Sequence, residues 1–258
     1  MEIGEIIGTG NTATVYQWGE NKVLKLFHES FPMEAIEREF KNAHLIREMD
    51  FAKPKAYEII LHGQQAGIVY DKVDGESLLD WVIRTENIYD CAVYMANLHK
   101  KIVKNKVRDV PNYKDFLKDN IEKVQDSNEK EEALTILDNL PEGDNLCHGD
   151  FHPGNIFIYK GKTSVIDFMN ICHGPLLYDI ARTIFLVQYT PIPEGIKHKE
   201  KLFQFKKRLA DLYLAQMRVD REMIEDYLSV LFTARMCEHP NQRSVDYFKV
   251  KKQKPTIE

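Results

Sequence analysis

The chain has 258 residues, of which 43% are hydrophobic and 29% are charged, and its formal net charge at pH 7 is -5. This composition predicts a globular protein with one large hydrophobic core or two smaller ones. No apolar run approaches the roughly 20 residues that cross a bilayer, and no basic stretch with interleaved aromatic residues is present, which argues against a membrane span and against nucleic-acid binding.

The four cysteines form no C-x-x-C pair and stand near no histidine cluster, so neither a disulfide framework nor a zinc site is predicted. They are Cys91, Cys147, Cys172 and Cys237. The start of the chain, Met1–Glu5, is acidic and lacks the basic and apolar blocks of a secretory signal. We therefore expect reduced, buried thiols and a cytoplasmic location.

Residues 1–73 are predicted to form a strand-rich N-terminal lobe. Five runs rich in β-branched and aromatic residues are separated by short polar turns. These runs are 2–7, 13–18, 22–28, 56–62 and 66–73. One helix interrupts them, because apolar residues recur at helical spacing from Met33 to Met49 and Pro32 stands where a first turn tolerates proline.

Residues 74–258 are predicted to form a mainly helical C-terminal lobe. A capping pattern at Ser77–Asp80 opens a helix that continues through Arg84. Further helices are expected at 88–103, 113–125, 130–140, 178–189, 199–217 and 221–238. Short strands are expected at 145–147, 155–159 and 163–166, and a turn at 160–162 joins the last two as a hairpin. The expected fold class is therefore α+β with two lobes.

Small residues gather between the first two predicted strands. Gly8, Thr9, Gly10 and Asn11 form a loop in which backbone N–H groups can close over phosphates. Ala13 stands where the usual protein-kinase pattern has its third glycine. A plain tight hairpin has the same composition, so the loop by itself is weak evidence for phosphate binding and needs support from the other motifs.

One lysine interrupts the apolar strand at 22–28. Alternation places Lys25 on the same face as Val23 and Phe27, so its ammonium must reach solvent or meet a negative charge. We interpret Lys25 as a phosphate-contacting lysine, with an edge-strand lysine as the alternative. Such a lysine needs a carboxylate to orient it, and the helix that begins at Met33 supplies candidates.

The most specific pattern is the run H-G-D-F-H-P-G-N at 148–155, followed twelve residues later by Asp167. Phosphoryl transfer needs one group to receive the acceptor's proton and oxygen atoms to hold magnesium. Asp150 is the candidate base, and Asn155 and Asp167 are the candidate ligands of Mg²⁺, a hard cation that prefers oxygen. A polar turn capped by Asp150 and Asn155 would explain the run, but it would not explain Asp167.

Three motifs together resemble the aminoglycoside phosphotransferase and choline kinase-like family: the run at 148–155, V-I-D-F at 165–168, and G-P-L-L-Y-D-I-A at 174–181. The resemblance extends along the whole chain in order. It implies a bilobal protein-kinase-like fold, with a nucleotide-binding lobe at 1–73 and a lobe at 74–258 that holds the catalytic hairpin, the metal site and the acceptor-binding helices.

The resemblance also implies an activity and further site residues. ATP or GTP would be the co-substrate, Mg²⁺ the cofactor, and a hydroxyl of a small molecule the acceptor. The step Arg38-Glu39 favours Glu39 as the partner of Lys25, with Glu37 as the competitor, because helical residues two apart point to different faces. Asp71 and Val73 occupy the place of the interlobe hinge, whose backbone groups would bind the adenine edge.

Three polar residues near these motifs are expected to be structural. We expect His148 to hold its loop by hydrogen bonding, Asp179 to cap a helix start and complement its dipole, and His99 to pack in the core. His152 is typical of the family and is assigned no chemical role.

The acceptor is left open among an aminoglycoside, an amino alcohol, a sugar and a related metabolite. Residues 194–258 carry 14 Lys and Arg against 10 Asp and Glu, which disfavours a polycationic antibiotic, although a solvated basic tail at 249–254 would give the same excess. Individual acids such as Glu225, Asp226 or Glu238 would still fit such a pocket. No obligate protein partner is expected.

Two other functions compete with small-molecule phosphorylation. A nucleotide-binding regulatory module without turnover is disfavoured, since no expected catalytic group is missing. A protein Ser/Thr kinase is disfavoured because the chain has no Ala-Pro-Glu motif and leaves little room for a long activation loop between Asp167 and Gly174.

Overall fold

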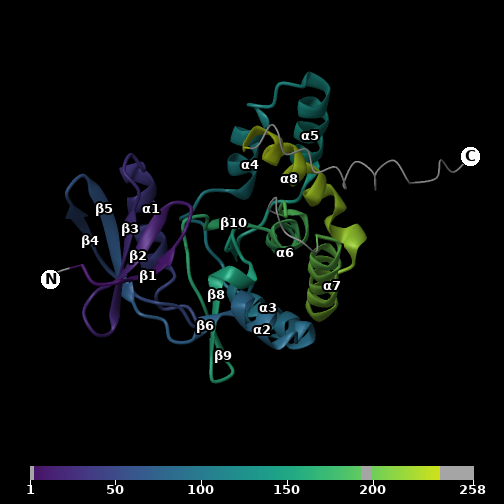
Figure 1. The fold of residues 1–258 in the computed structure, drawn as a ribbon. Helices are drawn as coiled ribbons and strands as arrows, with labels where there is room; N and C mark the ends of the chain where they lie inside the picture. Colours follow the sequence, from purple (N-terminus) through teal and green to yellow (C-terminus); the bar gives the residue numbers. More distant parts are fainter. Residues whose placement is uncertain (1–2, 193–198, 239–258) are drawn as a thin grey trace, which may run out of the picture.

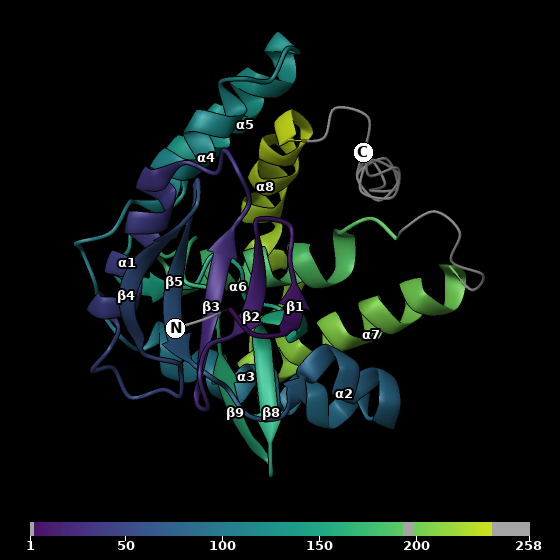
Figure 2. The same cartoon turned by 60° about the vertical axis from the view of Figure 1, so that its left-hand side comes forward.

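The computed structural model describes residues 3–192 and 199–238, which form two lobes (Figure 1). The N-terminal lobe is a five-stranded antiparallel sheet in the order β1-β2-β3-β5-β4. Its strands are β1 (Ile6–Thr9), β2 (Ala13–Gln17), β3 (Lys22–Phe27), β4 (Ala56–His62) and β5 (Gln65–Asp71). Helix α1 (Met33–Leu45) packs against β4 and β5, on the β4 side of the sheet in Figure 2.

The C-terminal lobe is mainly helical. Its helices are α2 (Leu78–Thr85), α3 (Ile88–Val103), α4 (Tyr113–Ile121), α5 (Ser127–Asn139), α6 (Leu176–Ile184), α7 (Lys199–Met217) and α8 (Glu225–Glu238). A π-helical turn, η2 (Phe185–Tyr189), continues α6, and a short 3-10 turn, η3 (Arg221–Ile224), precedes α8. Within the described residues, no helix is long and apolar enough to span a membrane.

Small sheets at the junction of the lobes carry the central motifs. Strand β7 (Asn145–Cys147) pairs with β10 (Cys172–Gly174), and β8 (Ile156–Tyr159) pairs with both β6 (Glu76–Ser77) and β9 (Lys162–Val165). The β8–β9 turn residues, Lys160 and Gly161, have φ angles of 48° and 74°. Two positive φ angles are what a tight type I′ hairpin requires, so the expected hairpin forms.

Several element ends differ from the expected ones for local reasons. Strand β1 covers Ile6–Thr9 in place of the expected 2–7, and a bulge between Ile6 and Gly8 shifts its register against β2. Helix α5 begins at Ser127, since the carboxylate of Asp126 accepts the N–H groups of the helix's first turn. Strands β6 and β10 were not expected, because two or three residues are too short to give a periodic pattern.

The alternation of β3 divides its side chains between two environments. Phe27 is fully buried in the large core that continues into the C-terminal lobe. Leu24 and Leu26 pack with Val69 in a second, smaller cluster on the other face of the sheet. Lys25 therefore shares the face of Phe27, directed toward α1 and the C-terminal lobe, as the alternation predicts.

Candidate active site

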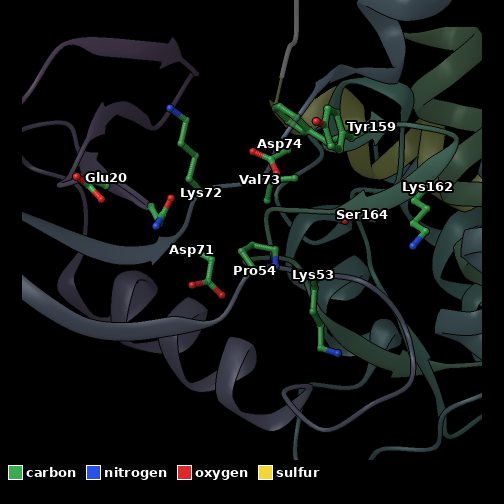
Figure 3. Close-up of a pocket in the computed structure, with 12 residues that line it drawn as sticks. Glu20, Lys53, Pro54, Asp71, Lys72, Val73, Asp74, Tyr159, Lys162 and Ser164 are labelled. Atoms are coloured by element: carbon green, nitrogen blue, oxygen red, sulfur yellow. The ribbon is translucent and has the colours of Figure 1, made fainter.

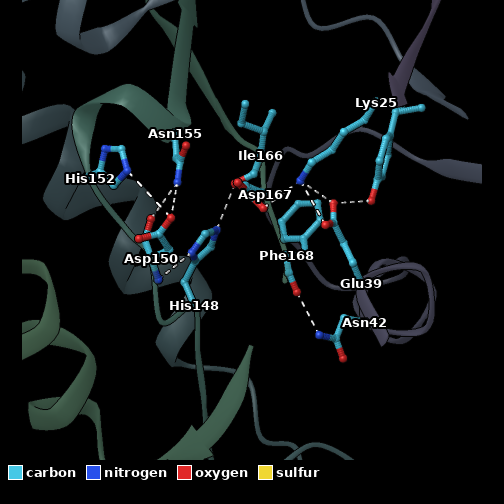
Figure 4. Close-up of polar contacts among 11 residues, drawn as sticks. Lys25, Glu39, Asn42, His148, Asp150, His152, Asn155, Ile166, Asp167 and Phe168 are labelled. Carbon is cyan, nitrogen blue, oxygen red and sulfur yellow. Dashed lines mark hydrogen bonds and ion pairs between the residues drawn. The ribbon is translucent and has the colours of Figure 1, made fainter. Parts of the chain in front are cut away.

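An ion-pair cluster joins the two lobes at Lys25 (Figure 4). The Lys25 Nζ atom lies 2.8 Å from Glu39 Oε1 and 3.0 Å from Asp167 Oδ1. Lys25 pairs with Val15 on one side and Ile68 on the other, so it stands in the interior of the sheet. Glu39 is 1% exposed, whereas Glu37 is exposed. The structure therefore pairs Lys25 with Glu39.

Burial and charge compete within this cluster. Burial raises the pKa of Glu39, while Lys25 and the Tyr70 hydroxyl, which donates to Glu39 Oε1 at 2.9 Å, act in the opposite direction. Burial also opposes ionisation of Asp167, but the nearby ammonium outweighs it, and the pKa of Asp167 lies below its ordinary value. The Lys25 pKa is raised, because its two carboxylates outweigh the effect of burial. With all three groups ionised, the cluster carries a net negative charge that favours a cation.

Asp150 and Asn155 face each other across the loop that follows β7. The Asn155 Nδ2 group donates to the Asp150 carbonyl at 2.9 Å and to the Asp150 carboxylate at 3.0 Å. Because the amide nitrogen is used in this way, its oxygen is left for another ligand. The Ile166 N–H donates to the Asn155 carbonyl at 3.0 Å, which ties this loop to the strand that leads to Asp167.

His148 holds this loop with both ring nitrogens. Nε2 donates to the Ile166 carbonyl at 3.1 Å, and Nδ1 accepts the Asp150 N–H at 3.3 Å. This pattern requires a neutral imidazole with its proton on Nε2. Burial lowers the pKa of His148, against the opposing effects of Asp179 and Asp150. The expected structural role of His148 agrees with these contacts.

Asp179 differs from its expected role as a helix cap. Helix α6 has no side-chain cap. The fully buried carboxylate instead accepts the backbone N–H groups of His148 at 2.7 Å and Gly149 at 2.9 Å. It also accepts Nε2–H of His99 at 2.8 Å, and His99 Nδ1 is hydrogen-bonded to the Tyr213 hydroxyl. His99 is therefore a polar partner of Asp179 as well as a core residue.

Two backbone positions in the site have left-handed conformations. Gly149 has a φ of 75° and Asp167 a φ of 69°. A Cβ atom at Gly149 would lie 2.2 Å from the Asn170 carbonyl oxygen, so only glycine fits there. For a non-glycine residue such as Asp167 this conformation costs about 1–2 kcal/mol, which the surrounding contacts must offset.

The remaining predicted residues lie at the end of β1, in the loop that follows it, and at the hinge. Gly8 and Thr9 end β1, and the Gly10 N–H donates to the Ala13 carbonyl at 2.9 Å, which closes the loop. At the hinge, the Asp71 N–H donates to the Lys55 carbonyl at 3.0 Å. The Asp71 carboxylate is also paired, since it accepts the Lys55 N–H at 3.1 Å and the Tyr57 hydroxyl at 2.6 Å.

A cavity of about 620 Å³ lies beside the hinge, between the lobes (Figure 3). It is lined by Asp71 and Val73 together with Lys53, Lys72 and Lys162. None of the proposed catalytic or metal-binding side chains lines it. The cavity is therefore separate from the ion-pair cluster and from the Asp150 loop.

A β-sheet lobe and a helical lobe, with a lysine–glutamate pair facing an Asp-Asn-Asp set, define a kinase-like class of protein. Residues 4–207 match the sequence model of the Phosphotransferase enzyme family. The chain belongs to this family, which confirms the resemblance inferred from the central motifs.

Curated relatives with partial similarity are methylthioribose kinases. The protein from Pectobacterium atrosepticum is 33% identical over 75 residues, which are 28% of this chain and 19% of that protein. The protein from Geobacillus sp. is 30% identical over 104 residues, 40% of this chain and 26% of that protein. The chain thus matches about a quarter or less of the length of these relatives.

Solved structures of kinases share the fold. A thermostable mutant of aminoglycoside phosphotransferase APH(4)-Ia in its apo form has a TM-score of 0.67 and 13% identity, over 97% of this chain and 92% of that chain. The amicoumacin kinase hAmiN in complex with AMP-PNP, Ca2+ and Ami has a TM-score of 0.60 and 17% identity, over 92% and 80%. These similarities confirm the two-lobed, kinase-like α+β fold.

Replacing Gly149 by alanine is expected to destabilise the protein. The backbone conformation alone costs about 1–2 kcal/mol, and the clash with the Asn170 carbonyl adds to it. Gly63 is a matched control, because its φ is 61° and nothing lies within 4 Å of an added Cβ. Urea denaturation should show a clearly larger loss for Gly149→Ala than for Gly63→Ala. Equal losses would contradict the assigned packing of the loop.

Acidification is expected to destabilise the protein through His148. Because burial lowers its pKa in the folded state, the unfolded chain binds the proton first. The free energy of unfolding should therefore fall as the pH drops below about 6.5, by at most about 1.4 kcal/mol per pH unit for one proton. Urea denaturation between about pH 8 and about pH 5.5 measures this slope.

Two variants identify the source of that slope. His148→Gln retains a side-chain donor but cannot titrate, so it should flatten the dependence. His62→Gln, at an exposed position at the end of β4, should leave the slope unchanged. If the wild type and His148→Gln have the same slope, the titrating group is not His148.

Proposed function

We propose that the protein transfers the γ-phosphate of ATP or GTP to a hydroxyl group of a small molecule, with Mg²⁺ as cofactor. The observation that carries this proposal is the 3.0 Å contact between Lys25 and Asp167, which are 142 residues apart in the chain. A phosphate-binding lysine opposite a metal-binding carboxylate is the arrangement that phosphoryl transfer requires. Membership of the phosphotransferase family and the AMP-PNP complex of hAmiN support the same reaction.

The phosphates would bind between Lys25 and the loop after β1. A Cβ atom at Gly8 would come no closer than 3.8 Å to Val15, and one at Gly10 no closer than 3.6 Å to the Ala13 carbonyl. Neither glycine is thus required by packing within the fold. Their small size is better explained by phosphates that approach the backbone of Gly8, Thr9, Gly10 and Asn11.

Asn155 and Asp167 fit a magnesium site. Their side-chain oxygen atoms suit a hard cation, and 31% of the Asp167 side chain is exposed. The described residues contain no cluster of three or more His, Cys, Asp or Glu side chains placed for a metal. Two protein ligands are enough for Mg²⁺, which in kinases keeps water and phosphate oxygens. When bound, the cation would offset charge on the phosphates.

Asp150 would act as the general base. One carboxylate oxygen accepts the Asn155 amide at 3.0 Å, so the other is available to orient the acceptor hydroxyl and receive its proton. His152 Nε2 lies 3.8 Å from the same carboxylate and is given no role in the reaction. The nucleotide base would contact the Asp71 carbonyl and the Val73 N–H at the hinge.

The acceptor class is tested with a panel of hydroxyl compounds. Partial similarity to methylthioribose kinases favours a sugar hydroxyl, and amino alcohols and aminoglycosides complete the panel. We expect acceptor-dependent ADP release that disappears when EDTA removes Mg²⁺. Nucleotide binding without turnover on every acceptor would instead favour the regulatory module.

Asp150→Asn is expected to reduce phosphate transfer by about 10²–10⁴-fold, because the amide cannot accept the proton. Nucleotide affinity should change little, since Asp150 does not contact the nucleotide. Steady-state turnover and equilibrium binding of AMP-PNP are measured on the same preparation. Asp144→Asn, which alters a surface carboxylate paired with Lys106, is the control. Wild-type turnover in Asp150→Asn would exclude Asp150 as the base.

Lys25→Ala is expected to weaken nucleotide binding and to slow turnover by about 10²-fold, because it removes a charge from the phosphates and leaves Glu39 and Asp167 without their cation. The same two assays measure both effects. Lys104→Ala removes an exposed lysine paired with Asp50 and should have no effect. Unchanged AMP-PNP affinity in Lys25→Ala would contradict the phosphate role.

A further inference from the structure

The candidate metal ligand Asp167 is held in its left-handed conformation through its backbone neighbours. On one side, the Ile166 carbonyl accepts Nε2–H of His148 at 3.1 Å. On the other side, the Phe168 carbonyl accepts the Nδ2 group of Asn42 at 2.8 Å. One of these contacts comes from the catalytic loop, and the other comes from helix α1 in the N-terminal lobe.

Asn42 lies on the face of α1 that also carries Glu39. The two residues are three apart, so their side chains lie on one side of the helix, and both are buried, with 3% and 1% of their surface exposed. Phe168 is 1% exposed. Figure 4 shows the Asn42 amide directed at the Phe168 carbonyl, beside the ion-pair cluster of Lys25.

The hydrogen bond from Asn42 to the Phe168 carbonyl requires an amide at position 42, and not merely a side chain that fills the space. A leucine at position 42 would have a similar branched shape, but it would leave the Phe168 carbonyl without this donor. That carbonyl belongs to the Phe168–Met169 peptide, one peptide unit beyond Asp167, so the hydrogen bond fixes the backbone of the residue that directly follows the metal ligand. Helix α1 thereby contacts the site twice, through Glu39 on the lysine and through Asn42 on the main chain.

We propose that Asn42 is a positioning residue for the metal site, which keeps Asp167 in the conformation that binds the cation and couples helix α1 to that segment. The inference rests on the proposed function in that Asp167 is taken as a ligand of Mg²⁺. Asn42 does not touch the nucleotide or the metal. Its effect is exerted through the backbone of Phe168.

The expected effect of Asn42→Leu is on metal affinity. Residues that orient a metal ligand typically change affinity by about 10–100-fold when replaced. We expect the dissociation constant for Mn²⁺ in the presence of AMP-PNP, measured by electron paramagnetic resonance, to rise by about tenfold or more. The Mg²⁺ concentration for half-maximal turnover should rise in parallel. AMP-PNP affinity without metal should be unchanged, because the pair of Lys25 and Glu39 is retained.

A matched control separates positioning from general stability. Asn105 donates its Nδ2 group to the carbonyls of Lys101 and Ile102 at 2.7 and 3.0 Å, at the end of α3. Asn105→Leu removes a similar amide hydrogen bond away from the site and should leave the Mn²⁺ dissociation constant unchanged. If Asn42→Leu lowers the melting temperature as Asn105→Leu does and binds Mn²⁺ like the wild type, the proposal is wrong.

A second variant covers the case in which Asn42→Leu does not fold. Asn42→Asp keeps the size of the side chain but turns a carboxylate oxygen toward the Phe168 carbonyl, and the same loss of Mn²⁺ affinity is expected. Wild-type affinity in Asn42→Asp would overturn the proposal. A wild-type protein that binds no Mn²⁺ with AMP-PNP would instead overturn the proposed function itself, so the two failures are distinguishable.

Discussion

The ammonium group of Lys25 is the charge on which the arrangement of the two lobes depends. Only 13% of the side chain is exposed, and an ammonium buried without partners costs several kcal/mol. Its partners come from distant parts of the chain, Glu39 from helix α1 and Asp167 from the segment after β9. Satisfying one cation therefore fixes the helix against the sheet and the Asp167 segment against the N-terminal lobe.

A second buried charge organises the site from the C-terminal lobe. The carboxylate of Asp179 accepts the N–H groups of His148 and Gly149, two main-chain donors that would otherwise be buried without partners. This contact orders the backbone directly before Asp150. Lys25 and Asp150 are thus positioned by different buried carboxylates, those of Glu39 and Asp179, and His148 connects the Asp150 loop to the Asp167 segment through the Ile166 carbonyl.

Local patterns were enough to predict the parts of the site that depend on neighbouring residues. The inward direction of Lys25 follows from strand alternation, and the β8–β9 hairpin follows from its turn residues. Local patterns could not predict contacts between residues that are far apart in the sequence. Asn42 donates to Phe168, 126 residues away in the chain, and Tyr70 donates to Glu39, 31 residues away. The periodicity of a helix or strand does not predict such contacts.

For Asp179, a local pattern predicted a role that the folded chain does not use. A carboxylate in the first turn of a helix is ordinarily explained as a cap, and the sequence contains nothing that contradicts this. In the folded chain the buried N–H groups of His148 and Gly149 are stronger competitors for it, because solvent cannot satisfy them. A local rule fails where a buried site needs the same group.

The segment after Asp167 bears on the size of the acceptor. Strand β10 begins at Cys172 and pairs with β7, and the His173 N–H donates to the Pro111 carbonyl at 2.9 Å. The four residues 168–171 between Asp167 and β10 include the buried Phe168 and Ile171, so this stretch belongs to the core. A long loop that would position a protein substrate has no place there, whereas a small molecule needs no such loop. The same fixed segment that holds Asp167 therefore favours a small acceptor over a protein.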